Sequence, residues 1–186
     1  LRHDTTGLLS NFLFEVSQVS MLVSHQLLWL LLTESETETG EEGHEVKGLV
    51  GPPTHGFQGS LSGDDTLPDL VKDLMKRILE TYDEDAKRLY EEEFKFFESI
   101  TSISGRLMEF EKDKRKEAIK DMLKADVRID DKQTLYLPSS PFDKVESIDY
   151  CSGTPMQSAA KCPFLLVFTV SPFDGPDSAL QEIKDK

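Results

Sequence analysis

The feature that most constrains the fold of this chain is a change in the period of its apolar residues. Through much of residues 67–131, apolar side chains recur three and four positions apart, which predicts amphipathic helices. In residues 132–186 they form short runs between prolines and glycines, which is typical of strands. The pattern therefore predicts an α+β chain in which helices precede an antiparallel β unit.

Three helices are expected in the middle of the chain. The first runs from Leu67 to Tyr82 and opens with a capping-box-like pair, Thr66 and Asp69, with Pro68 in the first turn. The next helix follows a cap at residue 83, and a glycine at position 105 is expected to bend or end it. A shorter helix is expected over residues 112–124. The stripe of the second helix is Ala86, Leu89, Tyr90, Phe94, Phe97, Ile100 and Leu107.

The β unit is expected to contain three runs of strand. They cover residues 134–137, 145–150 and 164–170, and each is bounded by proline or glycine. The last run holds six apolar residues and one threonine, so it is expected to form one continuous strand. After residue 174 a short polar tail is predicted.

The first 32 residues predict two helices joined near Ser17–Ser20. One face of the first carries Leu9, Phe12, Leu13 and Val16, and one face of the second carries Leu22, Val23, Gln26, Leu27, Leu30 and Leu31. Two helices alone cannot bury such broad faces, so they are expected to be the last pair of a helical stack. Polar residues interrupt the apolar stretch too often for a membrane-spanning helix or a signal peptide.

Residues 33–66 differ from the rest in composition. They are rich in glycine and glutamate and hold few large apolar side chains. Burial cannot offset the ordering entropy of such a segment. We predict a disordered acidic insert, with a functional loop as the alternative.

The charge of the chain excludes some functions. Its formal net charge is −14, which argues against nucleic-acid binding and weakens any charge-driven docking on an anionic membrane. More than half of that net charge lies in residues 1–66. Because the first residue is Leu1, we expect a processed chain or a fragment of a longer one.

Residues that could perform catalysis or bind a metal are few. The two cysteines, Cys151 and Cys162, lack zinc-ligand spacing, and every histidine lies within the first 55 residues. A reducing, cytosolic setting is the better interpretation of two ordinary thiols. The acidic run Glu91–Glu93 is interpreted as a solvated helix face, and the basic cluster at residues 112–116 likewise. No catalytic residue and no metal ligand is predicted.

One segment has the composition of an anion-binding loop. Residues 152–161 read Ser-Gly-Thr-Pro-Met-Gln-Ser-Ala-Ala-Lys. Small side chains let a backbone approach a phosphate, and the lysine supplies a point charge. On these grounds alone, an ordinary hairpin loop is the favoured interpretation.

The same segment carries a resemblance. Residues 148–165 closely resemble the amino-terminal lobe of phosphatidylinositol 4-kinases of the type III alpha class. Phrases of the same family occur upstream in the same order: Glu-Phe-x-Phe-Phe at 93–97, Ile-Thr-Ser-Ile-Ser at 100–104 and Tyr-Leu-Pro-Ser-Ser at 136–140. The phrase Ser-His-Gln-Leu-Leu-Trp at 24–29 resembles the end of the family's helical domain.

The resemblance implies a role for the loop and a division of the chain. In the family, the segment between the first two strands of the lobe covers the phosphates of ATP. Carried over by position, the phosphate-facing residues are Gln157, Ser158, Ala159, Ala160 and Lys161, and the strand after Pro163 roofs the adenine pocket. Residues 1–32 would end a helical domain of the phosphoinositide-kinase type, 33–66 would be the insert, 67–131 linker helices, and 132–186 an incomplete start of the kinase lobe.

The resemblance also implies an activity that this chain alone should lack. The family phosphorylates phosphatidylinositol at its 4-position with ATP and Mg²⁺. Its Asp-Arg-His-x-x-Asn and Asp-Phe-Gly motifs do not occur in residues 1–186, so the isolated chain is expected to be inactive and to need no cofactor.

Partners and location follow from the same resemblance. The whole kinase would be cytoplasmic and peripheral at the plasma membrane, on a scaffold complex. The alternatives are a truncated helical interaction module and a fragment of another phosphoinositide kinase family.

Overall fold

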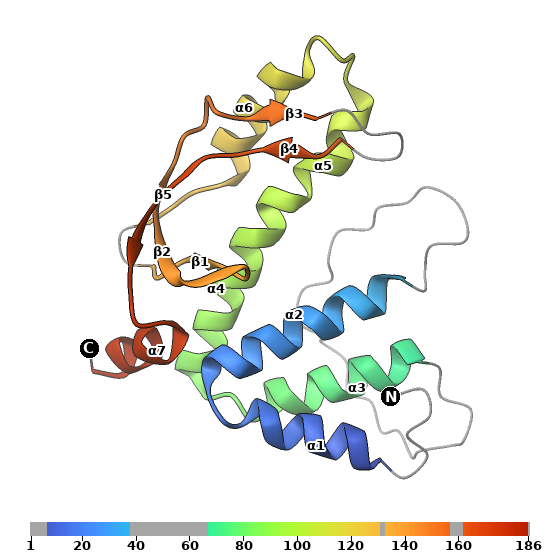
Figure 1. Cartoon of the computed structure of the whole chain (residues 1–186), viewed down its shortest axis with the longest axis vertical. Helices are drawn as coiled ribbons and strands as arrows, with labels where there is room; N and C mark the ends of the chain where they lie inside the picture. The colour runs from blue at the N-terminus through green and yellow to red at the C-terminus, as the bar shows by residue number, and fades with distance from the viewer. Residues whose placement is uncertain (1–6, 38–66, 131–132, 157–161, 186) are drawn as a thin grey trace. The chain divides into compact units, whose positions relative to one another are not determined.

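The computed structural model of the chain describes residues 7–37, 67–130, 133–156 and 162–185 (Figure 1). Its contacts divide the chain into two units. The first comprises residues 1–87 with 180–186, and the second comprises residues 88–179. The four-part domain organisation expected from the sequence stays a prediction, since this division concerns contacts alone.

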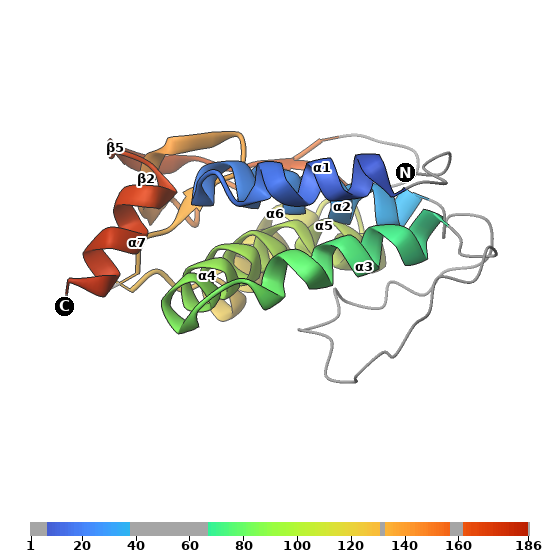
Figure 2. The ribbon, with the colours of Figure 1, turned by 90° about the horizontal axis from the view of Figure 1, so that it is seen from below.

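Three helices form the body of the first unit. They are α1 (Leu8–Ser17), α2 (Met21–Thr37) and α3 (Leu67–Glu80), and they lie side by side in both views (Figures 1 and 2). Leu28 of α2 and two residues of α3, Leu74 and Ile78, are fully buried. The helices expected before and after the insert are confirmed. The insert was predicted to be disordered from residue 33, but α2 continues through Thr37, so that boundary is wrong; residues 38–66 lie outside the described residues.

The buried face of α2 differs from the expected one. Gln26 and Leu30 are exposed, whereas Ser24 and His25 are buried. The Ser24 hydroxyl lies 2.5 Å from the Tyr82 hydroxyl. Apolar residues lie around most of the circumference of α2, so the spacing of these residues does not determine which face is buried. The packing of α2 against α3 determines it.

The second unit begins in α4 (Glu84–Thr101). The Ala86 N–H donates to the Asp83 carboxylate at 2.9 Å, so the cap at residue 83 is confirmed. The helix breaks at Ser102, three residues before the glycine that was expected to interrupt it, and continues as α5 (Ile103–Arg106) and the 3₁₀ turn η1 (Leu107–Glu109). The Thr101 hydroxyl donates to the carbonyl of Phe97, and the Ser102 hydroxyl donates to the carbonyl of Ser99. Such side-chain donors compete with backbone N–H groups for the helical carbonyls, which weakens the helix.

A short helix and two small antiparallel sheets complete the second unit. The helix is α6 (Arg115–Asp126), near its expected position. One sheet has the order β1 (Tyr136–Leu137), β2 (Ser140–Ile148), β5 (Phe168–Pro172), and the other pairs β3 (Thr154–Pro155) with β4 (Phe164–Leu165). In the larger sheet Val145 lies opposite Val170. The predicted α+β class is confirmed.

Two expectations for the end of the chain are wrong. The run 164–170 is not one strand but divides between β4 and β5, because Val167 donates to the Ser152 hydroxyl at 2.9 Å and accepts from the Asp149 N–H at 3.0 Å. The polar tail contains a helix, α7 (Pro176–Lys184). Gly175 precedes it with φ 89°, and Pro176 occupies a first position where no N–H is needed.

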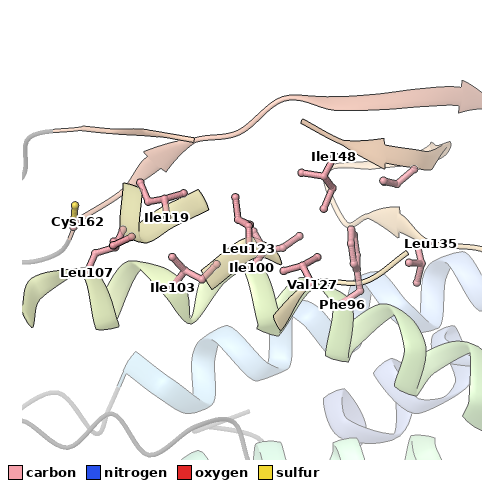
Figure 3. Packing of buried hydrophobic residues seen from close by; sticks show 12 residues of the cluster. Phe96, Ile100, Ile103, Leu107, Ile119, Leu123, Val127, Leu135, Ile148 and Cys162 are labelled. Atoms are coloured by element: carbon pink, nitrogen blue, oxygen red, sulfur yellow. The ribbon is translucent and has the colours of Figure 1, made fainter. Parts of the chain in front are cut away.

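One apolar cluster holds the second unit together. It collects side chains from the helices and from the strands, and Figure 3 shows them facing one another between α5, α6 and the β segments. Its buried members are Phe96, Ile100, Ile103, Leu107, Ala118, Ile119, Leu123, Val127, Leu135, Val145, Ile148 and Cys162.

Candidate functional site

The residues predicted to face phosphate form the segment between β3 and β4. Gln157, Ser158, Ala159, Ala160 and Lys161 all lie outside the described residues. Their predicted role therefore stays a prediction. The structure does describe both roots of the segment, the residues that hold its two ends.

The two roots form a narrow ribbon. Thr154 pairs with Leu165, and Pro155 pairs with Phe164. Beyond the pair, the Met156 N–H donates to the carbonyl of Pro163 at 2.7 Å. The chain therefore leaves and re-enters the described structure at adjacent points, which is the geometry of a hairpin.

A hydrogen-bonded turn precedes the ribbon. The Asp149 carboxylate accepts from the Cys151 N–H at 2.9 Å, and the Ser152 hydroxyl donates to the Asp149 carbonyl at 2.6 Å. Ser152 also accepts from the Val167 N–H on the returning chain. The Asp-x-x-Ser spacing of this turn was a signal in the sequence that could have located it.

Gly153 sits where the ribbon meets α6. A Cβ at this position would lie 2.3 Å from Cγ2 of Ile119 and 3.8 Å from Cδ1 of Leu123. Ile119 and Leu123 are both fully buried. Only a residue without a side chain allows this approach, and nothing in the sequence alone identifies the partner of Gly153.

Cys162 anchors the other root. Its side chain is fully buried and belongs to the apolar cluster, at the end where Ile119 and Leu107 lie (Figure 3). Cys151 is exposed, and both cysteines are free thiols. Sequence reasoning treated Cys162 as an ordinary thiol and missed its packing role.

The interpretation of Glu91–Glu93 as a solvated face is wrong for Glu93. That residue is fully buried, and its carboxylate accepts a 2.6 Å hydrogen bond from the hydroxyl of Tyr136, which is also fully buried. Burial, with the charges of Glu93 and Glu91, raises the pKa of Tyr90 to about 12. Burial also raises the pKa of Glu92. This polar centre joins α4 to β1.

Neither a metal site nor a membrane helix is found in the described parts of the chain. Among these residues, no group of three or more His, Cys, Asp or Glu side chains could hold a metal ion. No helix within them combines the length and the apolarity needed to cross a bilayer. A surface hollow of about 220 Å³ is lined by Ile129, Asp130, Gln133, Lys144, Val145 and Glu146, none of which belongs to the ribbon.

Comparison with known proteins shows which proteins this chain resembles. No family model matches the chain. The chain is 30% identical over 170 residues, 91% of its length, to phosphatidylinositol 4-kinase STT4 of Saccharomyces cerevisiae. It is 31% identical over 96% of its length to phosphatidylinositol 4-kinase alpha 1 of Arabidopsis thaliana, and 31% identical over 90% to alpha 2 of the same plant.

The chain is thus similar in sequence, over nearly its whole length, to lipid kinases. Within that class its relatives are phosphatidylinositol 4-kinases, and the resemblance to the alpha class is confirmed. The chain spans 8% of the length of the yeast protein and of alpha 1, and 29% of alpha 2.

Proposed function

We propose that this chain is a segment of a lipid kinase that transfers the γ-phosphate of ATP to the 4-hydroxyl of phosphatidylinositol. The observation that carries the proposal is its identity of about 30% with named phosphatidylinositol 4-kinases over about nine tenths of its length. The alternative of another phosphoinositide kinase family gains no support from these relatives. In the proposal, the segment joins the end of a helical domain to the start of the kinase lobe.

In the proposed kinase, residues 157–161 cover the phosphates of ATP. The hairpin geometry of the ribbon supports this proposal, because Met156 and Pro163 hold the two ends of the segment together. Small residues at Ser158, Ala159 and Ala160 would let backbone N–H groups approach an anion. Lys161 would add a point charge.

In this proposal, parts of the kinase other than residues 1–186 supply the magnesium ligands and the catalytic base. The described residues contain no group of three or more His, Cys, Asp or Glu side chains that could hold a metal ion. Phosphoryl transfer needs metal-assisted charge stabilisation and a positioned nucleophile. The isolated chain should therefore form no phosphatidylinositol 4-phosphate.

A lipid kinase assay tests the activity of the isolated chain. Radiolabelled ATP, Mg²⁺ and phosphatidylinositol vesicles are incubated with the chain, and the lipids are separated by thin-layer chromatography. We expect no labelled lipid above a no-protein control. Labelled product that scales with the chain, and persists after removal of co-purifying kinases, would contradict the proposal of inactivity.

The coding sequence around this segment tests the proposal of a kinase. We expect an open reading frame that continues to an Asp-Arg-His-x-x-Asn and then an Asp-Phe-Gly motif. The kinase would act on the cytosolic face of the plasma membrane, held by a scaffold complex. A stop codon directly after residue 186 in the mature transcript would overturn the kinase reading and favour the second candidate.

The second candidate is a helical interaction module. The observation that favours it lies in α1, where Leu8 is 71% exposed and Phe12 is 62% exposed. In the loop between α1 and α2, Val19 is 74% exposed. Such a module would bind a defined protein partner and would not bind ATP. Isothermal titration with ATP and Mg²⁺ tests this: an interaction module should give no binding heat, whereas the kinase segment joined to its catalytic lobe should bind the nucleotide.

A further inference from the structure

The turn between α5 and α6, residues 107–114, exposes two large apolar side chains at one end of the second unit (Figure 1). Met108, in η1, is 44% exposed, and Phe110, directly after η1, is 37% exposed. Leu107, the first residue of the turn, is fully buried in the apolar cluster of the second unit. The turn is therefore fixed at its base, while the two side chains beyond it face solvent.

Hydrogen bonds hold the backbone at Phe110. Its N–H donates to the Leu107 carbonyl at 3.2 Å, and its carbonyl accepts from Nε of Arg115 at 3.1 Å. The exposure of Phe110 thus belongs to a hydrogen-bonded turn. Water opposes the exposure of large apolar side chains, and two of them on one protruding turn indicate a surface that meets a partner.

Basic residues flank the same two side chains. Residues 106–116 contain five basic and three acidic residues, whereas the whole chain has a formal net charge of −14. The Lys114 ammonium lies 2.6 Å from the Glu111 carboxylate, so that pair is neutral. Lys112 and Lys116 are exposed, and neither forms an ion pair with any residue that the structure describes. The turn is therefore a locally basic site in an acidic chain.

Apolar side chains flanked by unpaired lysines fit the surface of a lipid bilayer. Aromatic and other apolar side chains enter the boundary between headgroups and acyl chains, and lysines beside them reach anionic headgroups. The local excess of basic residues is small, so the contact must depend on the apolar pair as well as on charge. A neutral protein groove would accept the apolar pair but would gain nothing from the two lysines.

We propose that the turn between α5 and α6 is a membrane-contact element. Met108 and Phe110 enter the interface of a bilayer that carries anionic lipids, and Lys112 and Lys116 contact its headgroups. The use of this contact to hold a kinase on its lipid substrate rests on the proposed function. The contact itself needs neither a nucleotide nor a catalytic lobe.

Vesicle co-sedimentation of the full 186-residue chain tests the apolar contact. The vesicles contain phosphatidylcholine and phosphatidylserine, because phosphatidylserine is not the proposed substrate and needs no catalytic pocket. The unchanged chain should sediment with them, and Met108→Ser combined with Phe110→Ser should weaken binding by about tenfold or more. The matched control is Leu8→Ser combined with Phe12→Ser, at side chains that are 71% and 62% exposed in α1. It should change binding by less than about twofold.

Charge variants test the contact with headgroups. Lys112→Glu combined with Lys116→Glu should weaken binding to the same vesicles by about tenfold or more. The control, Lys72→Glu combined with Lys95→Glu, makes the same change of net charge at two other exposed lysines. It should weaken binding by less than about threefold, because salt screens charges that do not approach the surface.

Fluorescence tests insertion directly. Phe110→Trp is combined with Trp29→Phe, which removes the one tryptophan of the chain. Vesicles with brominated acyl chains quench an indole that reaches the acyl boundary, so the emission of this variant should fall by about half. Trp29 in the otherwise unchanged chain should keep its emission.

Three results would overturn the proposal: no sedimentation of the unchanged chain with phosphatidylserine vesicles, equal losses in the Met108/Phe110 and Leu8/Phe12 variants, or no quenching in Phe110→Trp. Circular dichroism checks that each variant is folded. If the double serine variant does not fold, the charge variants and the quenching carry the decision. None of these measurements uses ATP, so a failure of the kinase proposal leaves a different record, an absent catalytic reading frame.

Discussion

The two units of this chain bury their apolar residues between different kinds of element. In the first unit, α1 has Ser17 as its one buried residue, and Leu9 and Phe12 of the same helix are exposed. In the second unit, helices and strands enclose a cluster of twelve buried residues. A helix that packs along one side leaves its remaining apolar surface to solvent, whereas helices combined with sheets close around a core.

The difference also concerns polar groups. The first unit pairs the hydroxyls of Ser24 and Tyr82, which are neutral. The second unit buries a carboxylate, Glu93, against the hydroxyl of Tyr136. Removal of a partner from a buried ionisable group costs more than removal from a neutral one. The second unit should therefore be the more sensitive of the two to substitution.

The largest expected effect contrasts Leu123→Ala with Leu9→Ala. Leu123 is fully buried, so its truncation should cost about 2–5 kcal/mol of unfolding free energy. Leu9 is 43% exposed, and its truncation should cost about 0.5 kcal/mol or less. Urea unfolding followed by circular dichroism measures both. A cost at Leu9 similar to that at Leu123 would break the contrast and indicate that α1 is covered in solution.

The next effect is a loss of stability at alkaline pH in the second unit. The pKa of Tyr90 is raised from 10.0 to about 12, so the folded state keeps the phenol proton that the unfolded state loses. The contribution is present below pH 10 and is lost as the pH rises to about 12, by roughly 2–3 kcal/mol.

Absorbance titration near 295 nm and urea unfolding at several pH values measure this loss. Tyr90→Phe is the control, because it removes the titrating phenol while keeping the ring beside Phe94 at a centroid distance of 4.1 Å. An identical pH profile in the variant would show that other groups cause the loss.

A matched pair of tyrosine variants sharpens the polar comparison. Tyr136→Phe deprives the buried Glu93 carboxylate of a donor and should cost about 1–3 kcal/mol. Tyr82→Phe removes a bond between hydroxyls and should cost about 1 kcal/mol. Trp29, the one tryptophan of the chain, lies in the first unit, so its fluorescence can follow the unfolding of the Tyr82→Phe variant. Equal costs would contradict the proposed contrast.

The smallest effect concerns acid in the first unit. The Lys184 ammonium lies 2.7 Å from the Asp83 carboxylate and lowers the pKa of that exposed group, with help from the Ala86 N–H. Because the pKa of Asp83 is lower in the folded state, the carboxylate stabilises the fold at pH values above 3.8, its pKa in the unfolded chain. This stabilisation is lost as the pH falls below 3.8 toward the folded pKa. Lys184→Ala should reduce this acid dependence slightly, as unfolding at pH 3 and pH 6 can measure. An unchanged difference would exclude a role for the ion pair.

Much of the helical structure could be predicted, and much of the candidate site could not. The period of residues 67–82 and the cap at Asp83 located α3 and the start of α4, because both signals are local. Residues 157–161 stay a prediction, since they lie outside the described residues. The anchoring of their roots by Ile119 and Cys162 involves residues far apart in sequence, which no local pattern reveals.

The sequence by itself determined the helices up to residue 101, the change from helices to strands, the turn before the loop and the resemblance to phosphatidylinositol 4-kinases, because periodicity, turn residues and a specific phrase are all local. Tertiary structure decided which face of α2 is buried, where the run 164–170 divides, and that Glu93 lies in the core. Each of these depends on a partner distant along the chain. The physical reason is shared: a backbone N–H, a hydroxyl or an apolar face takes its final partner only when the packing brings that partner within reach.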